Sequence, residues 1–441
     1  MTILKEELRN CPVCNSGHFV TLKEKPRWTP CRVIRDETGY RFHMRDVICT
    51  DCGMIYKNPM LTTDSMRDFY NGMYAELFKE NLQAGISKVA INDNILTTIY
   101  TLDFLSSISF PLKGKKVFEV GTGMGLLLKG MEGEGAIVDG IDLDARSIEL
   151  GNKLFGYNFK HISFDCLDDY TSPKYDLIVC NNSLEHFYNP AWVLDKFHSM
   201  LSPGGSILLE LPDARYPYPA TLSDAFLSSA HNHTFVHETI TPLLNSLGFQ
   251  VDYLRNAGHK KCMFILASPS VKAMNYSTVK LDPMNLKDEL LSLYQEIDLQ
   301  NVHNAKIGKE LSDGIYVNIG IDRTKTESPR TYNVRNLALA NMFLENGRTL
   351  DALSFLKEYG AGQPEDANCC YGSFLYLRAM CHRQLGDFVL AKKLLTECAT
   401  HYPNIRKYNF VKDLEIDGLV SNTVFSNYLW WNAEKILQDF G

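Results

Sequence analysis

One stretch of the chain decides the fold: Val117-Phe118-Glu119-Val120-Gly121-Thr122-Gly123-Met124-Gly125. Its first half is a short apolar run, which is typical of a buried parallel strand. The alternating glycines of its second half allow a tight turn into a helix, which we expect to begin near Gly125. By itself such a glycine pattern fits a dinucleotide as well as other nucleotide-like ligands, so the downstream sequence has to decide the ligand.

Further apolar runs follow the glycine-rich turn, and helix-like stretches such as 144–155 and 190–201 separate the first of them. This alternation predicts an α/β fold with a Rossmann-like, largely parallel sheet. The last two runs are joined by a short connection, which favours an antiparallel pair. Counting the run at 115–120, seven strands are expected, and the others cover 136–141, 161–164, 175–180, 206–211, 248–253 and 261–267.

Polar residues stand at the ends of three of these runs, at the edge of the sheet where such folds bind ligands. Asp142 can accept hydrogen bonds from both hydroxyls of a ribose, and Asp144 is the alternative for that role. Asp165 and Asn181 end the next two runs. We therefore expect the residues at these strand ends to contact the same ligand as the glycine-rich turn, with Asp142 or Asp144 at its ribose.

Together these motifs resemble the class I S-adenosylmethionine (SAM)-dependent methyltransferases, from about residue 85 to residue 270. The most specific stretch runs from Tyr175 to His186, and a nicotinamide enzyme has no reason to carry it. The resemblance implies an enzyme in which Asp142 binds the ribose of SAM and Asp165 its adenine amino group. It also implies that Glu185 and His186 line the cleft, which makes His186 a candidate catalytic residue. The cofactor-binding residues implied in this way are Glu119, Gly121, Thr122, Gly123, Gly125, Asp142, Asp165, Cys166 and Asn181.

Two C-x-x-C pairs precede this core, Cys11-Pro-Val-Cys14 and Cys49-Thr-Asp-Cys52. Two residues between thiolates let one tight turn aim both sulfurs at one ion, and two such turns complete a tetrahedral zinc site. Four thiolates leave no coordination position for water, so the predicted Zn²⁺ is structural. A small polar segment also needs such a cross-link, because it has little apolar surface to bury. Cys31, His18 and His43 are expected to be bystanders.

The segment Ala230-His231-Asn232-His233 falls between the fifth and sixth expected strands, which places it at the carboxyl edge of the sheet. A cysteine segment followed by this core resembles the zinc-containing sugar methyltransferases, which act on nucleotide-linked deoxysugars or related glycans. Their carbon-methylating members carry Tyr-His-Glu-His here, with the last histidine as base. His233 matches that base, but Ala230 and Asn232 replace the tyrosine and the glutamate. We therefore expect O-methylation of a sugar hydroxyl, on a glycan or a nucleotide-linked sugar, with His233 as general base.

Several alternatives remain open. The chain could instead methylate carbon on a nucleotide-linked keto sugar, or it could be a non-catalytic adaptor that keeps the SAM fold. His231, His233 and His237 could bind a metal, or each histidine could only cap or pack. Tyr70 and Tyr74 precede the core in a region that often forms a lid, so Tyr74 is a candidate for the acceptor pocket, although packing explains both tyrosines equally well.

The last third of the chain carries an internal repeat. Ala340, Gly347, Ala352 and Leu356 recur, each 39 residues later, as Ala379, Gly386, Ala391 and Leu395. Small alanines where helices touch, with glycine at the turn between them, resemble tetratricopeptide repeats. Two units are few for a solenoid, so flanking helices should cap them. Such a surface would dock a protein partner, or it would only pack against the catalytic domain.

The composition, 45% hydrophobic and 22% charged, is that of a globular protein, and 441 residues predict two or three large folding units. The net charge of −7 argues against a broad phosphate-binding surface and so against nucleic acid as a partner. No apolar run long enough to span a membrane stands out. Twelve cysteines, with a charged start unlike a secretory signal, predict a reducing, cytoplasmic location. The expected parts are a zinc-binding module (1–60), a methyltransferase domain (61–270, lid helices 61–110), a helical linker (271–332) and a tetratricopeptide-like domain (333–441).

Overall fold

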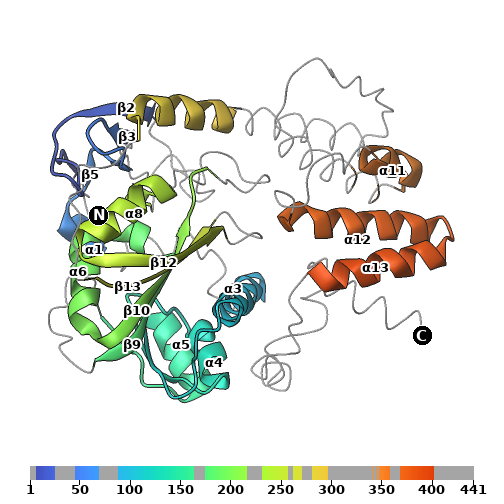
Figure 1. The fold of residues 1–441 in the computed structure, drawn as a ribbon, viewed down its shortest axis with the longest axis horizontal. Helices are drawn as coiled ribbons and strands as arrows, with labels where there is room; N and C mark the ends of the chain where they lie inside the picture. The colour runs from blue at the N-terminus through green and yellow to red at the C-terminus, as the bar shows by residue number, and fades with distance from the viewer. Residues whose placement is uncertain are drawn as a thin grey trace, which may run out of the picture.

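The structure of the chain is a computed structural model, and Figure 1 shows its elements in chain order. They form a large sheet covered by helices, a smaller sheet next to it, and a separate group of helices near the end of the chain. The described residues are 6–24, 45–68, 88–162, 174–215, 231–256, 262–270, 281–295, 340, 344, 347–357 and 368–401.

The large sheet has seven strands in the order β12-β13-β10-β9-β6-β7-β8. Strands β6 to β10 pair in parallel, whereas β13 runs antiparallel to both β10 and β12. The predicted α/β fold, the seven strands and the antiparallel last pair are therefore confirmed. The strands are β6 (Lys116–Val120), β7 (Ile137–Asp142), β8 (Lys160–His161), β9 (Tyr175–Asn181), β10 (Leu201–Pro212), β12 (Phe249–Asn256) and β13 (Cys262–Pro269).

Side chains along the central strands alternate between two buried faces, because successive residues of a strand point to opposite sides. In β9, Leu177 and Val179 join one hydrophobic cluster, while Ile178 and Cys180 join the other. Helices α3 (Lys88–Ser107), α4 (Leu126–Gly133) and α5 (Ala145–Phe155) supply the first cluster. Helices α6 (Pro190–Met200) and α8 (His237–Ser246) supply the second, so helices cover both faces of the sheet.

Local signals set where these helices begin. Helix α4 starts directly after Gly125, which adopts a left-handed backbone with φ 82°. Asp144 caps α5 by accepting a hydrogen bond from the backbone N–H of Arg146, and Asn189 caps α6 ahead of Pro190. The expected helices at 144–155 and 190–201 therefore match the structure to within one residue at each end.

A four-stranded sheet, in the order β11-β4-β3-β2, carries the paired cysteines of the N-terminal segment. Its edge strand β11 (His233–Thr234) comes from far along the chain, and His233 pairs with Tyr56. The N-terminal segment thus shares its sheet with a strand that follows β10 of the large sheet. The other strands of this sheet are β2 (Phe19–Glu24), β3 (Arg45–Cys49) and β4 (Ile55–Lys57). Strands β1 (Glu6–Glu7) and β5 (Met60–Leu61) pair antiparallel as a separate two-stranded sheet, and a short helix α1 (Thr63–Asp68) follows.

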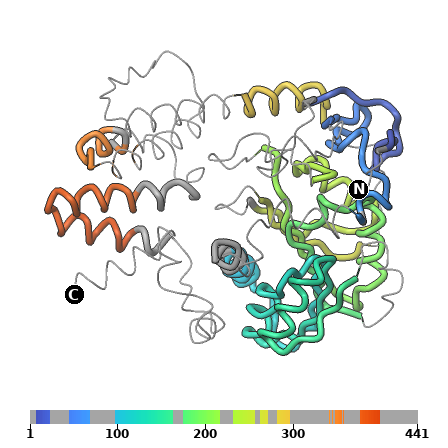
Figure 2. Tube along the Cα trace, turned by 180° about the vertical axis from the view of Figure 1, so that it is seen from behind, coloured from blue at the N-terminus to red at the C-terminus, as the bar shows by residue number. Residues whose placement is uncertain are grey.

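Part of the expected linker, residues 281–295, packs on this smaller sheet. A helix over 283–295 buries Leu286, Leu290 and Tyr294 in one cluster with Ile48 and Ile55 of the sheet. Figure 2 shows this helix beside the N-terminal strands from behind. The described part of the linker is thus a structural element of the N-terminal region.

The C-terminal helices are α11 (Thr349–Lys357), α12 (Asn368–Gln384) and α13 (Phe388–His401). Gly347 and Gly386 both adopt left-handed backbones, with φ of 72° and 80°, at the turns before α11 and α13. The four repeat alanines are each fully buried, and the repeat leucines nearly so. Both units therefore place the same residues at the same turn and the same helix contacts, as their offset in the sequence predicts. Among the described residues, no helix is both long and apolar enough to cross a membrane.

Candidate functional site

The glycine-rich loop after β6 lies at the carboxyl edge of the sheet. Gly121 and Gly123 have left-handed backbones, with φ of 81° and 56°, which only glycine adopts without strain. The N–H groups of Gly121 and Thr122 both donate to the carbonyl of Ile141, at 2.9 and 3.0 Å. A side chain at Gly121 would collide with the Ser183 hydroxyl, because an added Cβ would lie 2.1 Å from its Oγ. The loop is thereby fixed between the ends of β7 and β9.

Asp142 and Asp144, the two candidates for the ribose contact, do different work. Asp142 accepts the Gly123 N–H at Oδ2 and the Asp144 N–H at Oδ1, both at 2.7 Å. Asp144 caps α5 and accepts the Ser147 hydroxyl at 2.8 Å. Because a carboxylate oxygen has room for a second donor, Asp142 can hold the loop and still accept a ribose hydroxyl.

Glu119 lies beneath the loop and is almost fully buried. Its Oε2 accepts the Thr122 hydroxyl at 2.9 Å. Burial raises the pKa of Glu119 to about 8, and the nearby carboxylates of Asp142 and Glu210 add to the effect. Glu119 is therefore mainly protonated at neutral pH, so the loop rests on a neutral carboxylic acid.

The other predicted site residues fall into two groups. Asn181 ends β9, pairs with Glu210 of β10, and its Oδ1 accepts the side-chain amide of Asn182 at 2.7 Å. Asp165, Cys166 and Tyr74 lie outside the described residues, as do Tyr70, Ala230, Cys31 and His43.

A cluster of histidines meets the residues that follow β9. Glu185 and His186 form a short 3-10 helix, η4 (Leu184–His186), and His231 lies against them just before β11. His186 Nε2 is 3.8 Å from Glu185 Oε1, and the rings of His186 and His231 meet edge to face at 5.0 Å. The sequence predicts both segments at the same edge of the sheet, but it carries no signal that His231 meets Glu185 and His186.

His233 lies next to this cluster in β11 and is 1% exposed. Neither ring nitrogen has a hydrogen-bond partner among the residues that the structure describes. Burial lowers the pKa of His233 well below its ordinary value, and Arg9 lowers it further, so the imidazole is neutral. Its protonation state suits a general base, but an acceptor would have to reach a ring that protein covers. His237, by contrast, is exposed and pairs with Glu238.

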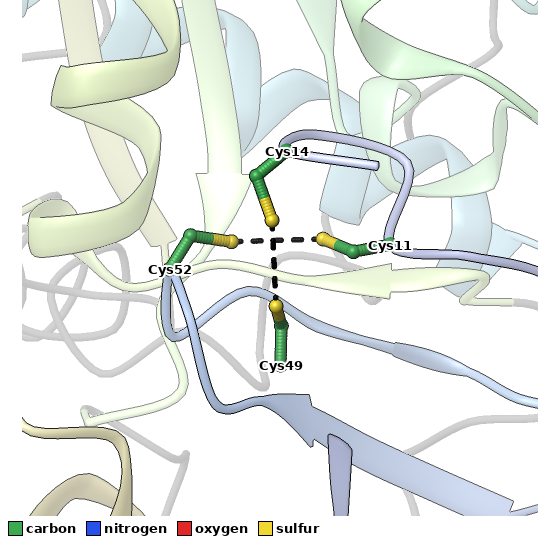
Figure 3. A group of neighbouring side chains, drawn as sticks. All are labelled: Cys11, Cys14, Cys49 and Cys52. Atoms are coloured by element: carbon green, nitrogen blue, oxygen red, sulfur yellow. Dashed lines mark hydrogen bonds between the residues drawn. The ribbon is translucent and has the colours of Figure 1, made fainter. Parts of the chain in front are cut away.

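The four paired cysteines converge on one point, as Figure 3 shows. Sulfur–sulfur distances are 3.6 Å between Cys11 and Cys52 and 3.5 Å between Cys14 and Cys49. Four sulfurs bound tetrahedrally to Zn²⁺ at about 2.3 Å stand about 3.8 Å apart. The cysteine geometry therefore fits one Zn²⁺, and the sulfurs are too far apart for disulfides.

Comparison with known families decides the class of this domain. The sequence pattern of the family described as "Methyltransferase domain" matches residues 99–254, from α3 into β12. This segment is a methyltransferase domain. The methyltransferase domain contains the glycine loop, η4 and β11, and SAM is the cofactor that such a fold binds.

Part of the chain is also similar in sequence to curated relatives. A ubiquinone biosynthesis O-methyltransferase of Psychrobacter arcticus is 31% identical over 126 residues, which cover 27% of this chain and 49% of the relative. That of Thiobacillus denitrificans is 34% identical over 100 residues, covering 22% and 43%. The chain spans about half the length of the curated relatives it matches. Among solved structures, magnesium protoporphyrin IX methyltransferase from Synechocystis with bound S-adenosylhomocysteine (SAH) is 16% identical with a TM-score of 0.37, covering 47% of this chain and all of that one.

Substitutions at the two aspartates distinguish their roles. Asp142→Ala should weaken SAH binding about tenfold or more, because it removes the carboxylate that holds the loop and is the predicted acceptor of the ribose hydroxyls. Asp144→Ala should cost about 1 kcal/mol of stability through the lost cap and leave SAH affinity nearly unchanged. Calorimetry with SAH and thermal unfolding measure both effects. The opposite result, in which only Asp144→Ala loses affinity, would move the ribose contact to Asp144.

The raised pKa of Glu119 predicts a pH dependence of stability. The folded-state pKa of about 8 exceeds the unfolded value of 4.5, so the folded state binds the additional proton between them. The free energy of unfolding of the cofactor-free protein should therefore fall as the pH rises through this window, by at most about 1.4 kcal/mol per pH unit. Denaturant titrations at several pH values should show this slope in the wild type and a shallower one in Glu119→Gln. The exposed control Glu134→Gln should keep the wild-type slope, and an unchanged slope in Glu119→Gln would contradict the assignment.

Proposed function

We propose that this chain is a SAM-dependent O-methyltransferase whose acceptor is a hydroxyl of a sugar, on a glycan or a nucleotide-linked sugar. The observation that carries the proposal is the meeting of His231 and His233 with Glu185 and His186 beside the loop. Ser183, which directly precedes η4, is the residue against which Gly121 packs. Candidate proton acceptors and the candidate cofactor site therefore share one edge of the sheet.

The chemistry requires little of the protein beyond alignment and one proton acceptor. The sulfonium of SAM already activates the methyl group, so the acceptor oxygen attacks the methyl carbon in line with the carbon–sulfur bond. That bond breaks as the oxygen–carbon bond forms, SAH leaves, and the hydroxyl proton passes to a base. Neutral His233 is the proposed base, with His186 next to it. Because His233 is buried, binding of the acceptor has to open a path to its ring. His186 and His231 are more exposed than His233 and lie next to it.

Asn232 supports O-methylation over C-methylation. Its side-chain amide donates to the carbonyl of His186, and its backbone N–H donates to the carbonyl of Glu185. Asn232 thus ties two segments together, and it offers no carboxylate to support proton removal from carbon. An oxygen acceptor, which is more acidic than most carbon acids, needs less help.

A second acceptor class has its own support. The relatives named above are O-methyltransferases of ubiquinone biosynthesis, which suggests an aromatic hydroxyl as acceptor. Their similarity covers 22–27% of this chain. We prefer a sugar because of the cysteine-rich segment ahead of the domain.

We also propose that Cys11, Cys14, Cys49 and Cys52 hold a structural Zn²⁺. Cys11, Cys49 and Cys52 belong to the hydrophobic cluster that lines one face of the large sheet. A metal there would stabilise the N-terminal strands and, through β4, the strand that carries His233.

Incubation with methyl-labelled SAM tests the proposed reaction. Nucleotide-linked sugars, oligosaccharides and catechols serve as acceptors, and NMR locates the labelled carbon in the product. We expect an O-methyl sugar, with kcat lowered about 10²–10⁴-fold in His233→Ala because the base is lost. SAH affinity should be unchanged in that variant, and the exposed control His198→Ala should retain full activity.

Each other result overturns part of the proposal. A methyl group on carbon would reject O-methylation, and a methylated catechol would favour the second acceptor class. Full activity in His233→Ala would remove the base assignment. A chain that binds no SAH would be the non-catalytic adaptor.

Metal analysis tests the zinc site. The purified chain should contain one zinc, and Cys49→Ser should lose it together with several degrees of melting temperature, because the folded state loses its ligand. The matched control Cys381→Ala changes a buried cysteine in α12, outside the four-cysteine cluster, and should keep its zinc. The site would be rejected if the purified wild-type protein contained no zinc and yet melted no lower than a zinc-loaded sample.

A further inference from the structure

We propose that Glu185, His186 and His231 form a second metal site, for a divalent transition-metal ion, separate from the four cysteines. One ligand atom from each of these three residues lies within 4.8 Å of the other two. Metal bonds of about 2.0–2.2 Å set ligand atoms at most about 4.4 Å apart, so small side-chain rotations complete the set. The two imidazoles and one carboxylate come from segments 45 residues apart in the chain.

The backbone around the three residues is held in place before any ion binds. Within η4, the His186 N–H donates to the carbonyl of Ser183 at 3.0 Å. Asn232, adjacent to His231, binds the carbonyls of Glu185 and His186 with its backbone and side-chain amides. Two hydrogen bonds thus tie the segment of His231 to η4, so the ligand set needs little ordering when it binds an ion.

The donor atoms select the class of ion. Imidazole nitrogens suit Zn²⁺, Fe²⁺, Co²⁺ and Ni²⁺ more than Mg²⁺ or Ca²⁺, which prefer all-oxygen sites, and the carboxylate of Glu185 also suits Mn²⁺. The Glu185 side chain is 2% exposed, and a buried carboxylate is stabilised by a cation beside it. Two histidines with one carboxylate are also the ligand set of sites that keep coordination positions open.

The site can take an additional ligand from outside the protein. Three protein ligands leave at least one position of a four-coordinate ion free. The His186 side chain is 14% exposed and His231 is partly exposed, so the ion would be accessible from this side. Its role in catalysis rests on the proposed function: an acceptor hydroxyl bound to the ion would become more acidic, next to His233.

Titration of the full-length protein with Mn²⁺ alone tests the site. Thiolates select softer ions, so Mn²⁺ should leave the cysteine site untouched. Electron paramagnetic resonance of free Mn²⁺ should show one ion bound per chain. Glu185→Gln and His231→Ala should each weaken binding about tenfold or more, whereas the control His198→Ala should bind as the wild type does. SAH calorimetry on every variant checks that the fold is intact.

Two outcomes would overturn the site: a wild-type protein that binds no Mn²⁺ at about 1 mM, or undiminished binding in both ligand variants. If one of the two variants loses SAH binding as well, its fold is disturbed, and the Mn²⁺ affinity of the other variant decides whether the site exists. Because Mn²⁺ binding is measured without an acceptor, a metal site in a chain that methylates nothing would sink the proposed function and leave this inference standing. Methyl transfer by a chain that binds no Mn²⁺ would support the proposed function and overturn the metal site.

Discussion

The pairing of β11 with β4 is the contact on which the arrangement of this molecule depends. His233 lies opposite Tyr56 and Thr234 opposite Ile55, so a strand from the methyltransferase domain completes the sheet of the cysteine segment. The backbone N–H of Lys57 extends the ladder by donating to Asn232, while its buried ammonium pairs with Asp46 of β3. A buried ion pair tolerates little displacement, because separation would leave a charge without compensation. The position of β11, and with it that of His231 and His233, is therefore fixed from the N-terminal side.

The pairing of β11 with β4 is also the part of the fold that the sequence does not predict. Long apolar runs predict the seven strands, and the spacing of the cysteines predicts that they converge, because both signals are local. Strand β11 has two residues, too few for any periodicity, and its partner lies about 180 positions earlier. From topology alone, the sequence predicts that His233 lies at the carboxyl edge of the large sheet. It could not predict that the ring is buried, or that His231 meets Glu185 and His186.

Asp142 shows how one residue can satisfy local and global demands together. The sequence predicts Asp142 as a ribose ligand, and in the fold Asp142 accepts the Gly123 N–H and holds the glycine loop. A loop built from left-handed glycines has high conformational freedom, so it needs such an anchor before it can present N–H groups to a ligand. Asp144 instead caps α5 and accepts the Ser147 hydroxyl, so its carboxylate holds the helix and not the loop. The geometry of the loop is thus a property of β7 as much as of the glycines.

Charge explains why Glu119 lies under this loop in its neutral form. Asp142 and Glu210 already place carboxylates nearby, and a third charge in the same buried space would be repelled and poorly solvated. SAM carries a sulfonium cation that SAH lacks, so carboxylates around the loop would favour SAM over SAH if the cofactor binds there as predicted. The same attraction opposes the reaction, because positive charge leaves the sulfur in the transition state. A protonated Glu119 would limit that cost for a SAM bound at the loop, while its oxygen still accepts the Thr122 hydroxyl.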